Sequence, residues 1–134
     1  MAKTIPATFR DLLSEKAAIA VLATVMPDGS PQATPLWFDY DNDRLRINTA
    51  TGRRKQRNLD QNPKVALVIL DPANPYRYLQ IRGRVVRKVT GAAAEEHIDR
   101  LAKKYLNQER YPFRQPGESR ILYEVEVGSC QSMG

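Results

Sequence analysis

The sequence contains a single cysteine, Cys130, so the chain cannot close a disulfide within itself or gather several thiolates around one metal ion. This scarcity favours a reducing compartment. The N-terminal residues lack the apolar block of a secretory signal. The longest apolar run, residues 17–23, is far shorter than the roughly 18 residues of a membrane span. We therefore expect a cytoplasmic protein without a membrane segment.

Sequence signatures of several enzyme classes are also missing. The chain has no GxGxxG, P-loop, HExxH or GxSxG motif, and its one histidine is His97. A metal hydrolase or a histidine-dependent triad would lack its usual parts, so we expect no metal site and no catalytic side chain. His97 falls beside an apolar stripe among Glu95, Glu96 and Asp99. We interpret it as a surface histidine of a helix, with a functional role as the alternative.

The length of 134 residues predicts one domain spanning residues 1–134. Apolar residues make up 42% of the chain and charged residues 27%, which is typical of a folded globular protein rather than a disordered one. The net charge of +6 favours an anionic partner. Charge alone cannot choose between a polyanion and a small anionic ligand.

Apolar segments separated by turn signals predict a mainly β protein. We expect strands near residues 18–25, 32–40, 45–50, 65–71, 76–89 and 120–127. Helices are expected over residues 5–16, 53–62 and 92–106, the last with Thr90 as its N-cap. The strand at residues 65–71 is almost wholly apolar, which predicts burial of both its faces. Six strands joined by hairpins favour an antiparallel barrel over a doubly wound sheet.

A basic cluster, GRRKQR, follows the third expected strand at the start of a short helix. A helix N-terminus offers free N–H groups and partial positive charge, and added Arg and Lys side chains make it a phosphate or carboxylate site. Arg53 and Arg57 share a face by their i,i+4 spacing. Lys55 joins them only if Gly52 or the first turn bends it inward. The alternative is a solvated helix face.

The strand expected over residues 76–89 has one apolar face and one aromatic, cationic face. The apolar face carries Leu79, Ile81 and Val85, and the other carries Tyr76, Tyr78, Gln80, Arg82 and Arg84. The second face is a polar outer surface, a subunit contact, or a wall against a planar anionic ligand. Trp37 also has two possible interpretations: it is a core residue, or it forms part of the wall of a ligand site or interface.

Two motifs occur here in an order and spacing typical of one protein family. DGSPQATP at residues 28–35 fits DGxPxxxP, and RRKQRNL at residues 53–59 fits RxKxRNL, followed by YRYLQIRGRV at residues 76–85. From about residue 10 to 106 the sequence resembles the pyridoxamine 5'-phosphate oxidase-like split β-barrel proteins. Within them it is most similar to the small branch that uses the deazaflavin coenzyme F420.

This resemblance implies a six-stranded antiparallel Greek-key split β-barrel and a homodimer with two equivalent cofactor sites between the subunits. The implied cofactor is coenzyme F420, with FMN as the alternative. By their match to the family pattern, Arg53 and Lys55 would hold the phosphate-bearing tail, with Arg57 adjoining. The other implied cofactor residues are Gln32, Thr34, Pro35, Leu36 and Trp37 along the ring, Asn48 and Thr49 beside it, and Tyr76 and Tyr78, which would close the site from the partner chain.

The implied reaction is hydride transfer from reduced F420 to an electron-poor planar acceptor such as an enone, a quinone or a tetrapyrrole. The alternatives are an FMN-dependent oxidoreductase of the pyridoxamine-phosphate-oxidase type and a non-enzymatic carrier of a flavin or haem-type ligand. No nucleic-acid partner is expected, because no recognition motif accompanies the basic cluster. No side chain stands out as a proton donor, and residues 107–118 carry no motif that says whether they cover the site.

Overall fold

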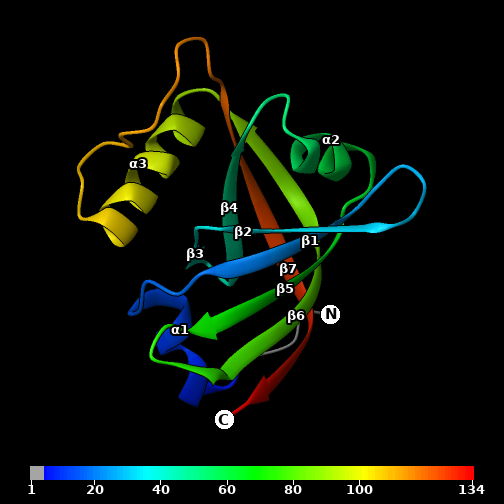
Figure 1. Ribbon diagram of the computed structural model, residues 1–134, viewed down its shortest axis with the longest axis vertical. Coiled ribbons are helices and arrows are strands. Elements are labelled where there is room, and N and C mark those ends of the chain that lie inside the picture. The colour runs from blue at the N-terminus through cyan, green and yellow to red at the C-terminus, as the bar shows by residue number, and fades with distance from the viewer. Residues whose placement is uncertain (1–4) are drawn as a thin grey trace.

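A computed structural model describes residues 5–134 (Figure 1). The elements are η1 (Ala7–Phe9), α1 (Asp11–Ser14), β1 (Ala20–Val25), β2 (Pro31–Leu36), β3 (Phe38–Asp41), β4 (Arg44–Ala50), α2 (Arg54–Gln61), β5 (Lys64–Asp71), β6 (Asn74–Thr90), α3 (Ala92–Leu106) and β7 (Arg120–Met133). The helix expected over residues 5–16 is instead two short turns, η1 and α1. Within the described residues, no helix is long and apolar enough to cross a membrane.

One antiparallel sheet contains every strand, in the order β2-β1-β5-β6-β7-β4-β3. The mainly β, antiparallel prediction is therefore confirmed, but the described residues form seven strands rather than six. The strand expected over residues 32–40 divides at Trp37, because β2 pairs with β1 at one edge of the sheet and β3 pairs with β4 at the other. The two peptide units around Trp37 reach only about 7 Å, so the sheet must curl until its edges meet.

The long strands β6 and β7 make this curl possible, since they pair with each other along most of their length. Register shifts fall between Arg82 and Gly83 and between Val85 and Arg87, and such bulges bend a strand and increase its twist. A Cβ atom on Gly83 would lie 2.2 Å from the carbonyl oxygen of Glu126. Only glycine therefore allows the backbones to approach this closely at the bend.

The inner face of the curled sheet holds the apolar core, with Leu22, Leu67, Ile81 and Tyr123 among its fully buried members. Each such side chain contributes about 1.5–3 kcal/mol by leaving water. The strand expected near residues 120–127 is confirmed as part of β7, and its alternate residues Ile121, Tyr123, Val125 and Val127 all lie in this core.

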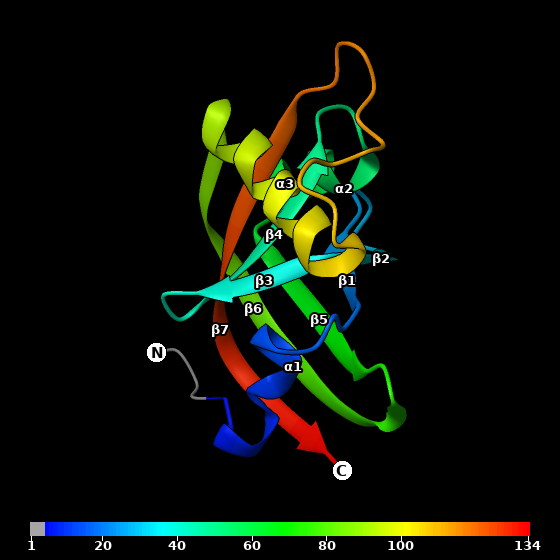
Figure 2. The same ribbon diagram turned by 90° about the vertical axis from the view of Figure 1, so that its left-hand side faces the viewer.

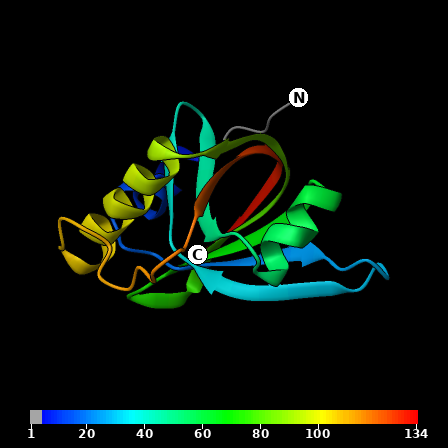
Figure 3. The ribbon, with the colours of Figure 1, turned by 90° about the horizontal axis from the view of Figure 1, so that it is seen from above.

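The helix α3 lies outside the barrel and packs against β4, β6 and β7 (Figures 2 and 3). Its apolar stripe of Ala94, Ile98, Leu101 and Ala102 is buried, as the sequence predicted. The N-cap prediction is wrong: Thr90 is the last residue of β6, and Gly91 caps the helix at φ 78° without a side-chain hydrogen bond. Figure 3 shows α2 and α3 on different sides of β4, which leaves the end of this strand between them.

The expected burial of both faces of β5 is wrong for the isolated chain. Residues Val65, Leu67 and Ile69 are buried, whereas Ala66 and Val68 on the outer face are only partly covered. Across the sheet, Ala66 and Val68 adjoin Ala23 and Val21 of β1. This pairing creates an apolar area on the outside of the barrel, which we call the outer patch.

Candidate functional site

A cavity of about 190 Å³ opens where the end of β4 meets the start of α2, between Trp37 and α3. Three walls surround it. Pro35, Leu36 and Trp37 form one wall, Arg53, Lys55 and Arg120 form a cationic wall, and Tyr111 and Phe113 close a third side. Asn48 and Thr49, the neighbours of Ala50 at the end of β4, form the floor together with Ile98 and Leu101 of α3. Seven of the predicted site residues thus meet at one place.

The local backbone explains why Arg53 and Lys55 both reach the cavity. Gly52 has φ +95°, a left-handed conformation that favours glycine, and Arg53 is extended at the N-cap position of α2. Because Arg53 precedes the helix, the expected shared face with Arg57 does not form. Arg57 is exposed and does not line the cavity. The bend at the first turn, which the sequence left open, is what brings Lys55 inward.

The cationic wall carries more positive than negative charge. Burial, and then the nearby charges of Arg53 and Arg120, lower the pKa of Lys55. Among the described residues, the guanidinium groups of Arg53 and Arg120 contact one carboxylate, that of Glu118, whose Oε1 lies 3.2 Å from Nη1 of Arg120 and 3.9 Å from Nη2 of Arg53. The carboxylate of Glu95 accepts a hydrogen bond of 2.9 Å from the backbone N–H of Arg120. An anionic ligand group would relieve the repulsion among these three cations.

Thr49 supplies a second feature that suits a ligand. Its side chain is 2% exposed, and its Oγ1 has no hydrogen-bond partner among the described residues. An unpaired buried hydroxyl costs about 1–3 kcal/mol, which a ligand atom would offset by bonding to it. The Oγ1 atom of Thr34, on β2, is buried without a partner in the same way, although Thr34 does not line the cavity.

Aromatic rings form the third wall. Trp37 stacks on Tyr105 of α3 and meets Tyr111 edge to face at 6.0 Å, and Tyr111 meets Phe113 edge to face at 5.7 Å. Trp37 is half-buried and lines the cavity, so it combines the two roles that the sequence left open.

Tyr111 and Phe113 belong to the loop of residues 107–118, which follows α3 in Figure 2. The loop is held against α3, because the backbone N–H of Tyr111 donates to Asp99 at 2.8 Å and Arg114 donates to Glu95 and Asp99. This wall was not predicted, because residues 107–118 carry no motif that says whether they cover the site. Its only sequence signal is the aromatic pair of YPF in an otherwise polar loop.

Arg120 was also missed as a site residue. It begins β7 and is 4% exposed, with its guanidinium carbon 5.1 Å from the ring centre of Tyr111. The available signal was an arginine at the head of an apolar strand, on the same side as the apolar Leu122. Arg120 is paired with Glu118, but Arg53 and Lys55 leave the wall with an excess of positive charge, which is typical of an anion site.

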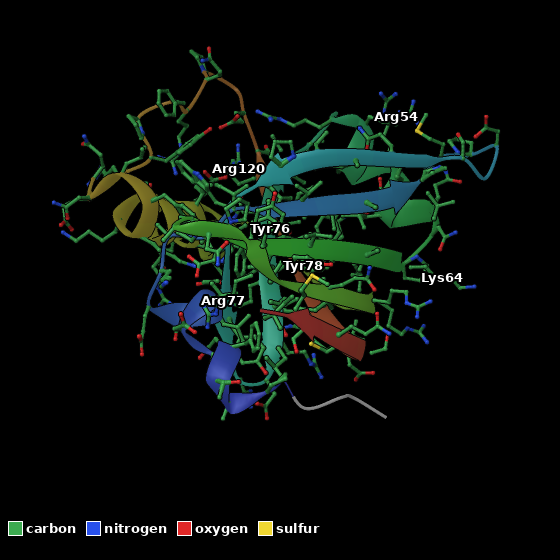
Figure 4. The ribbon with its side chains drawn as sticks, turned by 60° about the horizontal axis from the view of Figure 1, so that its bottom comes forward. Arg54, Lys64, Tyr76, Arg77, Tyr78 and Arg120 are labelled. Atoms are coloured by element: carbon green, nitrogen blue, oxygen red, sulfur yellow. The ribbon has the colours of Figure 1, made fainter. Side chains whose placement is uncertain are left out.

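Besides Arg57, four predicted site residues lie elsewhere. Gln32 accepts a hydrogen bond from Thr24, which accepts one from Asn58 of α2, so it fastens this helix to the sheet. Tyr76 and Tyr78 lie on the first half of β6 (Figure 4). β6 lies three strand spacings from β2, because Leu79 pairs with Ile69, Ile69 with Ala20, and Ala20 with Leu36. Three spacings correspond to about 14 Å. Within one chain, the tyrosines therefore do not meet the cavity, and Thr34 is the fourth such residue.

The interpretation of His97 as a surface histidine is wrong. His97 is 3% exposed, and its ring bonds to Asp39 at 2.9 Å and to Asn48 at 3.0 Å. The helix turns this residue toward β3 and β4 because it adjoins the buried stripe of Ala94, Ile98 and Leu101. Burial by itself would raise the pKa of Asp39. The hydrogen bonds from His97 and Arg46 outweigh this effect and lower the pKa to about 2, from an ordinary value of 3.8.

A family model of pyridoxamine 5'-phosphate oxidase matches residues 5–133. The chain belongs to the pyridoxamine 5'-phosphate oxidase family. This membership and the resemblance to the F420 reductase branch, both inferred from the two motifs, are confirmed. A solved structure described as an F420 reductase shares 34% identity and has a TM-score of 0.81, and the match covers 95% of this chain and 98% of the other.

Two more distant structures share the fold of this family member. A conserved hypothetical protein from Mycobacterium tuberculosis is 18% identical, with a TM-score of 0.71 over 98% of this chain and 86% of its own. HupZ of group A Streptococcus is 19% identical, with a TM-score of 0.67 over 96% of this chain and 94% of its own. None of the curated proteins compared with the sequence matches it.

Proposed function

We propose that this protein transfers a hydride from reduced coenzyme F420 to an electron-poor planar acceptor. The observation that carries the proposal is the cavity itself, which brings Arg53, Lys55 and Arg120 together with aromatic side chains and the unpaired hydroxyl of Thr49. The F420 reductase with 34% identity supports the choice of cofactor. Family membership supports an oxidoreductase with a flavin-type cofactor.

In this proposal the three cations hold the phosphate-bearing tail of the cofactor, because guanidinium and ammonium groups donate charge-assisted hydrogen bonds to phosphate oxygens. Thr49 and the backbone of Pro35 to Trp37 orient the ring, with Asn48 beside it. Bound F420 would supply the hydride. The chain's own contribution is position and a partly dry pocket, made by Trp37 and the 107–118 loop.

Among the described residues that line the cavity, none is Asp, Glu or His, and the proton-bearing groups are those of Lys55 and Tyr111. In this proposal the proton that accompanies hydride transfer comes from solvent or from Tyr111. The flat aromatic surfaces of Tyr111 and Phe113 suit a planar acceptor of the enone, quinone or tetrapyrrole type.

We also propose a homodimer in which the outer patch of one chain packs on that of a second copy. The patch includes Val21, Ala23, Ala66 and Val68, and Gln80 and Arg82 of β6 adjoin it. It reaches the cavity, since Val21 pairs with Pro35 across β1 and β2. Tyr78 lies at its border, because its neighbour Leu79 points into the core. A second copy on this patch would bring the partner's Tyr76 and Tyr78 toward the cavity.

The test is a fluorescence titration of the purified protein with F420 and, separately, with FMN. We expect an Arg53→Ala, Lys55→Ala double variant to weaken cofactor binding on the order of a hundredfold, since each charged contact contributes about 1.5–3 kcal/mol. The matched control is Arg100→Ala, Arg110→Ala, which removes the same charge from exposed positions outside the cavity. Unchanged affinity of the first variant for both cofactors would contradict the proposed site.

The same titration separates the alternatives. Quenching of deazaflavin fluorescence by a colourless protein supports F420, whereas a yellow protein that retains FMN identifies the FMN-dependent oxidoreductase. Cofactor binding without turnover of quinones, enones or tetrapyrroles under reducing cofactor would instead identify a carrier.

A further inference from the structure

A chain of buried polar groups connects the sheet-facing side of α3 to the cationic wall of the cavity. His97 of α3 bonds to Asp39 of β3 on one side and to Asn48 of β4 on the other. Asn48 in turn accepts a hydrogen bond of 2.8 Å from Nε of Arg120. His97, Asn48 and Arg120 are all less than 7% exposed, so water cannot substitute for these contacts.

The hydrogen-bonding groups at the two ends fix the orientation of the Asn48 amide. Arginine only donates, so Oδ1 of Asn48 must face Arg120. The carbonyl oxygen of Ala94 only accepts, so the amide nitrogen must face this carbonyl, at 2.9 Å. The second hydrogen of that nitrogen points to Nδ1 of His97, at 3.0 Å.

This orientation dictates the proton arrangement of His97. Nδ1 has to accept the hydrogen bond from Asn48, so it carries no proton. Nε2 carries the proton and donates a hydrogen bond to the carboxylate of Asp39, which also accepts two hydrogen bonds from Arg46. A proton on Nδ1 would face the amide N–H of Asn48, which would push the amide to turn and set its nitrogen against Arg120.

Arg120 depends on this orientation for its place in the cavity. Its Nε bonds to Asn48, its Nη1 contacts Glu118 at 3.2 Å, and Tyr111 covers its guanidinium. With Asn48 turned, Glu118 would remain the one fixed acceptor among the described residues. The guanidinium would then be drawn toward Glu118 and away from the floor of the cavity.

We propose that His97, although it does not line the cavity, is a positioning residue that holds Arg120 in its anion-binding orientation through Asn48. The inference rests on the proposed function only in requiring that the cavity binds an anionic group. Its first test needs no ligand and no variant. The ¹⁵N chemical shifts of the imidazole at neutral pH should report the Nε2–H tautomer, and an Nδ1–H tautomer or a doubly protonated ring would overturn the proposal.

The second test compares three replacements of His97, with inorganic phosphate as the probe and the Arg120 side-chain Nε–H resonance as the readout. His97→Asn places an oxygen near the position of Nδ1 and should keep the wild-type affinity within a few-fold. His97→Gln reaches Asp39 but offers no acceptor to Asn48, and His97→Leu offers neither. Both should weaken phosphate binding on the order of tenfold, the effect of one charge-assisted hydrogen bond.

A double-mutant cycle distinguishes positioning from general loss of structure. In an Asn48→Leu background the link to Arg120 is already broken, so His97→Leu should weaken phosphate binding no further. Additive losses, equal affinity of the Asn and Gln variants, or no phosphate binding by the wild type would each overturn the inference. Failure of the proposed function looks different: phosphate binding would depend on His97 as predicted, but neither F420 nor FMN would bind.

Discussion

Trp37 and Tyr105 stack face to face, with ring centroids 5.2 Å apart and ring planes 5° from parallel. The contact fastens α3 to the single residue that joins the two edges of the sheet. The Tyr105 hydroxyl strengthens it by donating its one hydrogen to the carbonyl oxygen of Ala18 and accepting from the N–H of Phe38, with the carbonyl oxygen of Phe38 also within 3.2 Å. Burial, the main cause, raises the pKa of Tyr105 above its ordinary value. The cavity wall and the junction between the two edges of the curled sheet thus share one anchor.

Removal of this hydroxyl should destabilise the fold. We expect Tyr105→Phe to lower the free energy of unfolding by about 1–3 kcal/mol, because the carbonyl oxygen of Ala18 loses its side-chain donor while the ring stack remains. Urea denaturation measures the difference. Tyr111→Phe is the control, since the Tyr111 hydroxyl makes no hydrogen bond within residues 5–134, and it should be nearly neutral. Equal effects of the two changes would contradict the anchoring role.

Phe113 should affect the acceptor rather than the cofactor or the fold. Its side chain is 58% exposed at the outer end of the aromatic wall. We expect Phe113→Ala to lower kcat/KM for a quinone acceptor roughly tenfold, the loss expected when a ring no longer covers a bound apolar surface, with cofactor Kd unchanged. Leu106→Ala, an exposed apolar residue outside the cavity, serves as the control. A parallel rise in cofactor Kd would place Phe113 in the cofactor site instead.

Asp39 should make the protein sensitive to acid. Its pKa in the folded protein is about 2 against an ordinary 3.8, so its contribution to stability is present above about pH 4 and is lost as the pH falls toward 2. The shift corresponds to about 2 kcal/mol. Asp39→Asn should therefore cost about that much near neutral pH and progressively less between about pH 4 and 2. Urea unfolding across this range tests it, and a difference independent of pH would argue against the ionised carboxylate.

The outer patch offers a test of the proposed homodimer. We expect the wild type to elute as a dimer and Val68→Glu as a monomer, because the new carboxylate would be buried without a partner at the subunit contact. Light scattering coupled to size-exclusion chromatography gives the mass directly. Val86→Glu places the same charge at the exposed bulge of β6 and should leave the dimer intact. A monomeric wild type would exclude the proposed arrangement.

Local sequence patterns were sufficient for much of the fold and for part of the site. The turn at Asp28 and Gly29, the alternation of β7 and the apolar stripe of α3 arise from interactions between near neighbours, and all three are present in the structure. Lys55 could not be placed from its spacing, because its direction depends on the left-handed backbone of Gly52. The strand through Trp37 was likewise predicted to be continuous. The residues around Trp37 carry no signal that β2 and β3 pair at opposite edges of the sheet.

By itself the sequence determined the family, the antiparallel β class and the basic cluster ahead of α2, because motifs and hydrophobic periodicity are properties of short segments. Only the tertiary structure decided that Arg120, Tyr111 and Phe113 join that cluster, and that His97 is buried against Asn48 rather than exposed. These residues come from elements far apart in the chain. They meet because the sheet curls around Trp37 and α3 packs across β4, a long-range event that no local pattern records.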